Sequence, residues 1–469
     1  MAGKLSKIAG ALATLLLISN CGVSPDAQSP GFPLETGIPF SPTASLTPGM
    51  VFELPGHDPD LFQPIELTHN PPLIARSDET VMLVFDVVNT LSCAGSCSIR
   101  PSLFYSYGES GYFQTMPLSE ELVNEMQSLI AMLPATDPMG GSLRYYAEFS
   151  IPEDGYTFRY PVAGTIDLFT SSVFISVDLP PEKPVQPGET VLNFDWGAGP
   201  EEVGQLTFEG FPQLIGPPAL DVSADGRIAL LDPGNNRILV FDPLVKSYTS
   251  FPLPFTYKSM GDVQFDSQGQ LAILDLIGEE VEGSPVPIPQ VYRLFPDGSL
   301  AAAGPVYAKF PTKFVQDLEV LDYFDGRTVA AINAVGEINS REAQRQKHTW
   351  ELPYRFVQGE EGLDWSRAWF ADVKEARAFE VHFDTPAGAI VAFERTPQGY
   401  LMVWGAMNAY QLRAVWIDPE GSVLKDVTLP NEQYTQLSLY GDLVTAQDGS
   451  LYLLSSTKQG IGVHFVSAP

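Results

Sequence analysis

The sequence predicts an all-β protein in which a small β-sandwich precedes a β-propeller. Three observations support this prediction. Short runs of alternating apolar and polar residues recur along most of the chain, turn residues interrupt them about every ten positions, and the C-terminal half repeats a pattern of four short strands. A chain of 469 residues is longer than one ordinary domain, so two or three folded units with linkers are expected.

Residues 1–21 are predicted to be an export signal. Lys4 and Lys7 precede an apolar stretch from 8 to 18 that is too short to span a bilayer. The four residues ending at Cys21 resemble the cleavage box of bacterial lipoproteins, with Asn20 at a position where a smaller residue is usual. The resemblance implies that Cys21 carries a lipid anchor on the outer face of the membrane in the cell envelope. The alternatives are an ordinary cleaved signal with secretion, or an uncleaved anchor.

A spacer and a sandwich are expected next. Residues 22–50 are rich in Pro, Ser and Thr and have no apolar period, which is typical of a flexible linker. Residues 51–179 carry strand patterns, for example at 80–88 and 102–107, and their order resembles immunoglobulin-like modules of bacterial surface proteins. Residues 118–133 have helical spacing, so a crossover helix or a longer loop is expected there.

Cysteine usage fits an exported protein. Apart from Cys21, the chain has only Cys93 and Cys97, separated by three small residues. Outside the cytoplasm such a pair is expected to form a disulfide across a tight loop. A metal site would need further soft ligands at a suitable spacing, and the sequence offers none, so no metal is predicted.

Residues 180–205 are predicted to be a Pro-rich, semi-rigid hinge followed by the entry into the propeller at 206–469. The stretch 216–242 contains three short apolar runs, a tight hairpin at Asp225-Gly226 and a polar turn at 232–237. The sequence of this stretch resembles an NHL repeat, and the resemblance implies an NHL-like β-propeller.

The number of blades is predicted from the length of this region. Its 264 residues give 44 per blade for six blades, close to the usual size of a four-stranded blade. Hairpin glycines at 226, 269, 326, 399 and 449 are separated by 43, 57, 73 and 50 residues. Because the third interval is ambiguous, five blades with an insertion are the alternative. A strand from before the first blade, near 191–194 or 203–208, is expected to complete the last blade and remove its exposed edge.

The net charge and the histidine content narrow the classes of partner and of catalytic site that are expected. The net charge of −31 repels nucleic acid and anionic lipid, so nucleic acid is not expected as a partner and contact with the membrane is expected through the anchor only. Five scattered histidines suggest no catalytic triad or metal triad. Asp232, the asparagines after it and Arg237 match the NHL signature loop and are expected to brace adjacent turns.

One segment, 337–378, combines cations with aromatic residues in an otherwise acidic chain. We expect it to form a ligand-binding face that stacks on sugars or grips a protein or an anion. Asp364 is expected to cap a helix with two tryptophans on one side, and docking of that side on the ring is the alternative. The predicted ligand-binding residues are Arg341, Arg345, Lys347, Trp350, Tyr354, Trp365 and Trp369.

Together these features predict an exported, lipid-anchored surface protein whose propeller binds an extracellular peptide, protein or glycan without catalysis. The NHL resemblance also implies an alternative, a hydrolase or lyase acting on an extracellular substrate from the channel of the ring. No catalytic residue and no cofactor is predicted, and the oligomeric state is left open.

Overall fold

The computed structural model describes most of residues 65–469, and the longest gaps in this description are at 91–99, 134–140, 254–260, 280–287, 329–353 and 431–442. The predicted signal, the spacer and the three cysteines Cys21, Cys93 and Cys97 lie outside the described residues. No helix in the described part of the chain is both long enough and apolar enough to cross a bilayer.

Two sheets face each other in the N-terminal region. The first has the order β1 (Ile65–His69), β3 (Val81–Thr90), β7 (Met126–Leu133) and β6 (Ser119–Val123). The second has the order β2 (Ile74–Arg76), β10 (Ile166–Ser171), β8 (Gly141–Ile151), β4 (Arg100–Tyr107) and β5 (Gln114–Pro117), with β9 (Tyr156–Tyr160) also paired to β8. All these pairs are antiparallel except β2 with β10, which is parallel.

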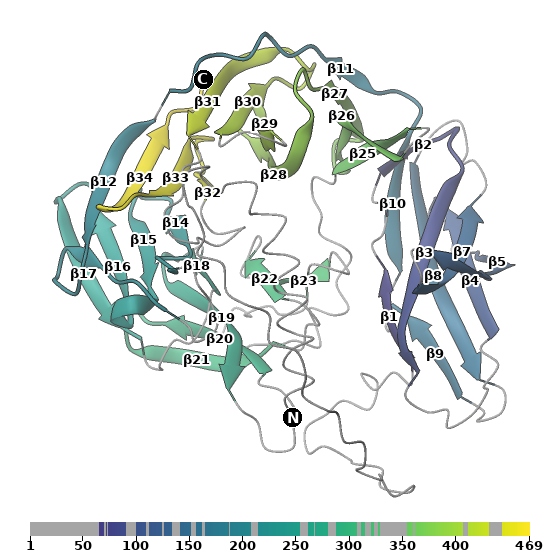
Figure 1. Ribbon diagram of the computed structural model, residues 1–469, viewed down its shortest axis with the longest axis horizontal. Coiled ribbons are helices and arrows are strands. Elements are labelled where there is room, and N and C mark those ends of the chain that lie inside the picture. Colours follow the sequence, from purple (N-terminus) through teal and green to yellow (C-terminus); the bar gives the residue numbers. More distant parts are fainter. Residues whose placement is uncertain are drawn as a thin grey trace, which may run out of the picture.

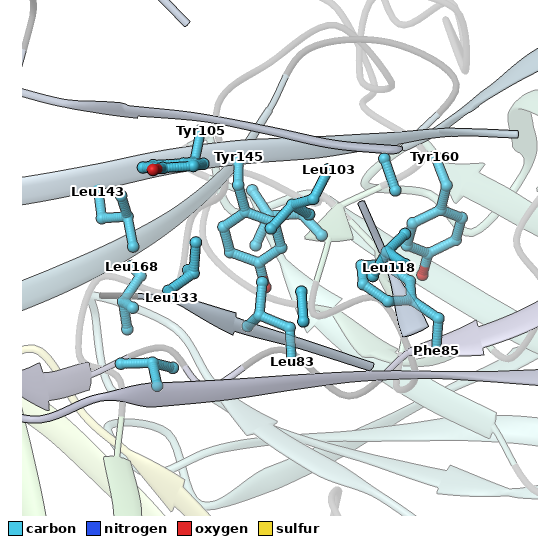
Figure 2. Close-up of a cluster of buried hydrophobic side chains, with 14 of the residues drawn as sticks. Leu83, Phe85, Leu103, Tyr105, Leu118, Leu133, Leu143, Tyr145, Tyr160 and Leu168 are labelled. Atoms are coloured by element: carbon cyan, nitrogen blue, oxygen red, sulfur yellow. The ribbon is translucent and has the colours of Figure 1, made fainter. Parts of the chain in front are cut away.

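The core of this sandwich follows from the period of two in its strands. In β3, Leu83 and Phe85 are fully buried whereas Met82 between the buried positions is 54% exposed. They meet Leu103 and Tyr145 from the opposite sheet, and Figure 2 shows these side chains lying between the two layers. The expected β-sandwich is therefore present.

The helix or loop expected at 118–133 is wrong. This segment forms the antiparallel hairpin β6–β7. In β7, Leu129, Ala131 and Leu133 point into the core, while Ile130 and Met132 occupy the outer face. Because both faces of the strand carry apolar side chains, the sequence also fits a helical spacing, and packing in the sandwich decides the outcome.

Six further sheets are formed by the described residues that follow the sandwich. Three of them consist of strands in simple succession: β14 (Leu220–Val222), β15 (Ile228–Asp232), β16 (Arg237–Asp242) and β17 (Ser247–Pro252); β18 (Gly261–Phe265), β19 (Leu271–Glu279), β20 (Ile288–Leu294) and β21 (Leu300–Pro305); and β28 (Ala387–Thr396), β29 (Gly399–Ala406), β30 (Gln411–Ile417) and β31 (Val423–Pro430). A fourth, with three described strands, contains β22 (Pro311–Phe314), β23 (Val320–Asp322) and β24 (Arg327–Thr328).

The other two sheets each take strands from the segment that precedes the repeats. One contains β25 (Tyr354–Gly359), β26 (Gly362–Asp372), β27 (Arg377–His382) and the parallel outer strand β11 (Ile175–Val177). The other contains β32 (Leu443–Thr445), β33 (Leu451–Ser456), β34 (Gly460–Val466), β12 (Glu189–Trp196) and β13 (Glu202–Val203). Since β12 pairs antiparallel with β34, the expected completion of the last sheet by an earlier strand is confirmed.

These six sheets pack face to face in one succession. Those from β25–β27 to β18–β21 follow the arc in Figure 1, and β22 and β23 are seen inside it. Buried apolar clusters join β25–β27 to β28–β31, then to β32–β34, to β14–β17, to β18–β21 and finally to β22–β24. Antiparallel sheets stacked radially in this way form a β-propeller. The face of the β25–β27 sheet that is turned away from β28–β31 packs on the sandwich.

The predicted hairpin glycines are found at the expected turns. Gly226, Gly269 and Gly449 have φ values of +83°, +73° and +86°, a region that favours glycine. Gly326 lies outside the described residues. The long interval between Gly326 and Gly399 contains the β25–β27 unit, and the Gln358-Gly359 pair at its β25–β26 turn was not among the predicted hairpins.

The Pro-rich segment between β11 and β12 differs from a free hinge. Residues 178–188, here called the strap, run along the outer edge of the β28–β31 sheet (Figure 1). The backbone N–H of Gln186 donates to the carbonyl of Thr428 at 2.8 Å, and Lys183 Nζ donates to the carbonyl of Asp426 at 3.2 Å. The strap is therefore a bound element that connects outer strands of two sheets.

Candidate functional site

The signature loop of the first repeat is a structural brace. Asp232 is fully buried, and its Oδ2 accepts from Arg237 Nε at 2.9 Å while its Oδ1 accepts from the backbone of Gly204 at 2.9 Å. Asn235 donates to the same carboxylate and to the carbonyl of Gly197, each at 2.9 Å. Asn236 has a φ of +52°, as expected for asparagine in a left-handed position. The predicted bracing role of this loop is confirmed.

Two carboxylates on the inner edge strands tie neighbouring sheets together. Asp221 of β14 accepts the backbone N–H of Phe265 at 2.6 Å, and Asp262 of β18 accepts that of Phe314 at 2.7 Å. Burial raises the pKa of Asp221 to about 7 and that of Asp262 to about 6, against the lowering effect of these hydrogen bonds. Ionising either carboxyl in the folded protein therefore costs more free energy than in water.

Sequence reasoning missed this pair, although a signal was present. An aspartate followed by valine stands at the start of both inner strands, at 221–222 and 262–263. The recurrence of one polar residue at the same place in two repeats indicates a common structural role, which here is a hydrogen bond to the next sheet.

The structure describes three of the seven predicted ligand-binding residues: Tyr354, Trp365 and Trp369. Arg341, Arg345, Lys347 and Trp350 lie outside the described residues. Tyr354 lies in β25 and packs with the cluster shared with β28–β31. The expected helix after Asp364 is wrong, because 362–372 form the strand β26.

Trp369 is buried where the propeller meets the sandwich. It is 5% exposed and packs with Ile74 and Phe169 of the sandwich, and its ring lies 5.0 Å from that of Phe174. This tryptophan therefore joins the β25–β27 sheet to the sandwich, which differs from the expected docking of a helix on the ring.

Arg355 strengthens the same interface. Its guanidinium donates to both carboxylate oxygens of Glu79, at 2.9 and 3.2 Å, and to the carbonyl of Ile74 at 3.2 Å. Both charged side chains are about one-fifth exposed, with values of 20% and 22%. A bidentate pair with this degree of burial orients the sandwich on the β25–β27 sheet.

Trp365 remains partly open to solvent because the register of β25 and β26 slips beside it. Phe356 pairs with Ala368 whereas Val357 pairs with Asp364, so residues 365–367 have no partner in β25. Such bulges re-aim side chains. The ring of Trp365 is 36% exposed and lies 4.7 Å from the ring of Phe356.

The bulge is internally braced. The side chains of Ser366 and Arg367 hydrogen-bond to Asp364 and lower the pKa of its carboxyl to about 2. The Arg367 contact is 2.7 Å, and the backbone N–H of Ser366 also donates to this carboxylate, at 3.0 Å. Trp365 is therefore held by ordered neighbours on both sides.

Two residues after Trp365, Arg367 takes part in a charge network that reaches the sandwich. Glu380 lies 3.7 Å from Arg76 of the sandwich, 3.8 Å from Arg367 and 3.4 Å from His382. We call Trp365, Arg367, Glu380, His382 and Arg76 the bulge cluster. It combines one exposed aromatic side chain with donors and acceptors of both charge signs, a combination suited to stacking and hydrogen bonding.

No known protein family matches the sequence, and no curated protein matches it. Among solved structures the chain is similar to virginiamycin B lyase from Staphylococcus aureus, with 14% identity, 56% of this chain and 88% of that chain covered, and a TM-score of 0.29. It is similar to regucalcin, a calcium-binding protein from Agrobacterium tumefaciens, with 11% identity, 57% of this chain and 95% of that chain covered, and a TM-score of 0.24. It is also similar to a protein of unknown function from Bacteroides caccae, with 13% identity, 50% of this chain and 82% of that chain covered, and a TM-score of 0.25. At these values nothing about activity follows for this chain, and its fold is assigned from its own sheets.

Proposed function

We propose that this protein is an exported, lipid-anchored envelope protein that binds an extracellular peptide, protein or glycan at the bulge cluster. In this proposal an immunoglobulin-like sandwich at 51–179 and a six-bladed NHL-like propeller at 206–469 form one supporting body. The observation that carries it is Trp365, a large aromatic side chain that is 36% exposed and is held in a braced bulge beside a buried interface.

The charges of the cluster favour a ligand that is not strongly anionic. Arg76 and Arg367 are balanced by Asp364 and Glu380, and the whole chain carries a net charge of −31. A platform that is ordered before binding loses less conformational entropy when the ligand arrives. A neutral glycan, which stacks one apolar face on an aromatic ring and uses its hydroxyls on charged neighbours, is the first ligand class to test.

Replacing Trp365 by alanine should weaken binding of such a ligand at least tenfold. A well-placed aromatic anchor contributes about 2 kcal/mol or more, and the tryptophan ring is the largest apolar surface in the cluster. A panel of soluble neutral glycans and uncharged peptides, measured by isothermal titration calorimetry against the wild-type protein, identifies the ligand, and the variant is then titrated with it.

The matched control is Tyr112→Ala, since Tyr112 is an aromatic residue of the sandwich that is 78% exposed and outside the cluster. This variant should bind like the wild-type protein, and both variants should keep its melting temperature. If Trp365→Ala keeps full affinity for a ligand that the wild-type protein binds, the ligand-binding surface is elsewhere.

Anchoring is tested separately. Cells that express the full chain and are fed a labelled fatty acid should incorporate the label into this protein, because Cys21 would be acylated. Cys21→Ala should abolish incorporation and release the protein from the membrane fraction. Equal labelling of the wild-type protein and the variant would contradict the anchor without affecting the binding proposal.

A further inference from the structure

A serine and a histidine meet on the last sheet of the propeller. Ser455 of β33 and His464 of β34 are both half-buried, and Ser455 Oγ lies 2.6 Å from His464 Nε2. This is the distance of a hydrogen bond between a nucleophile and its general base. The sheet that carries the pair is separated from the bulge cluster by the whole β28–β31 sheet, so the two places are independent.

The other side of the imidazole ring faces β12. His464 Nδ1 lies 3.3 Å from Thr190 Oγ1, and the ring also hydrogen-bonds to the backbone of Gly188. Thr190 Oγ1 can accept a hydrogen bond from Nδ1–H, and in that tautomer the lone pair of Nε2 is directed at the serine hydroxyl. Burial lowers the pKa of His464, so the ring is neutral and basic at neutral pH.

Gly462 leaves space at the point where a reacting atom would lie. It is two residues before His464 on the same strand and pairs with Ser455. A Cβ at this glycine would lie 3.1 Å from His464 Nε2 and 3.4 Å from Ser455 Oγ. An acyl group attacked by Ser455 needs free space beside Oγ, and the missing side chain at Gly462 supplies it. Any other residue here would fill that position.

We propose that Ser455 is a nucleophile for acyl transfer, with His464 as its general base, Thr190 and Gly188 as positioning groups, and a small carboxylic ester as the class of substrate. The Ser455 Oγ–carbon bond forms as the proton passes from Oγ to Nε2. The carbon–oxygen bond to the leaving alcohol then breaks, and the alcohol takes this proton. Water attacks the resulting acyl-serine, gives a proton to Nε2, and releases the acid as the proton returns to Oγ.

The test uses the full chain and a biotinylated fluorophosphonate, which transfers its phosphorus to an activated serine with loss of fluoride and a proton. We expect covalent labelling at Ser455, identified by mass spectrometry of the modified peptide. Ser455→Ala should lose the label, and His464→Gln should reduce its rate at least 100-fold, within the range contributed by a general base. The rate of p-nitrophenyl acetate hydrolysis should fall in both variants, and more in Ser455→Ala than in His464→Gln.

Gly462→Ala is the decisive variant because it keeps both reacting side chains and closes the space between them. It should lose the label. Gly405→Ala is its matched control: Gly405 also lies in a propeller strand, but a Cβ there would meet its nearest atom at 3.6 Å, an ordinary contact, and labelling should persist. Melting curves identify any variant that fails to fold. An unlabelled wild-type protein, or a folded Gly462→Ala variant labelled at the wild-type rate, would overturn the proposal.

Discussion

Replacing Asp372 by alanine should lower the free energy of unfolding by about 2–3 kcal/mol, because it removes a fully buried carboxylate from a hydrogen-bonded network whose cation, Arg395, is 38% exposed. The carboxylate is fully buried at the end of β26 and accepts from Arg395 Nε at 3.0 Å and from Tyr400 Oη at 2.9 Å. It also accepts the backbone N–H groups of Lys374 and Glu375, each at 3.1 Å. Since Arg395 and Tyr400 belong to the next sheet, the substitution should weaken the contact between the two sheets.

Urea unfolding followed by fluorescence measures this effect. The control is Asp418→Ala, because Asp418 accepts two backbone N–H groups in an exposed turn and has no cation in contact, and its loss should cost about 1 kcal/mol or less. Asp372→Asn should lie between the two, since the amide keeps one acceptor oxygen. A loss below about 1 kcal/mol in Asp372→Ala would show that the network contributes no net stability.

The local features of the fold could be predicted from the sequence because their causes are local. The hairpin at Gly226 and the three strands around it depend on turn residues and on alternation within about 25 residues, and all were found. The brace formed by Asp232 and Arg237 was predictable for the same reason, since the two side chains lie only five residues apart.

Features that depend on distant pairing were not predictable in this way. The contact of Arg355 with Glu79 joins residues 276 positions apart. The strap lies on an edge whose existence depends on the complete β28–β31 sheet, so its prolines indicated stiffness but not the surface to which it binds. Trp365 and Trp369 are four apart, which fits one side of a helix and one side of a strand equally well, and the β-rich surroundings decide between them.

The serine and histidine of the last sheet show the same limit for a site. Nine residues separate Ser455 from His464, and nothing in that spacing implies contact. The pair meets because the β33–β34 register places Ser455 opposite Gly462, next to His464 on the same side of the strand. The register itself depends on a turn and on the addition of β12, so the convergence becomes visible only in the assembled sheet.

Replacing Asp221 by asparagine should stabilise the protein more at pH 7.5 than at pH 5. The quantity compared is the free energy of unfolding of the variant minus that of the wild-type protein at the same pH. The folded pKa of Asp221, about 7, lies above the ordinary value of 3.8, so between these values the native state binds more protons than the unfolded state. The contribution of this group to stability is complete below about pH 4 and is lost as pH rises through 7. Asparagine keeps an acceptor for the N–H of Phe265 and cannot ionise.

The difference between variant and wild type should therefore grow by about 2 kcal/mol from pH 5 to pH 7.5. Asp262→Asn should show the same trend with its change finished by about pH 7, because the pKa of Asp262 is raised only to about 6. The lowered pKa of His464 acts in the opposite direction but is common to all three proteins, so it cancels in the difference.

Asp225→Asn is the control: hydrogen bonding from Ser223 lowers the pKa of this exposed carboxyl, and its contribution does not change in this interval. Urea unfolding of the four proteins at half-unit steps of pH would give the slopes, and a flat difference for Asp221→Asn would mean that this carboxyl is already ionised at pH 5 in the folded protein.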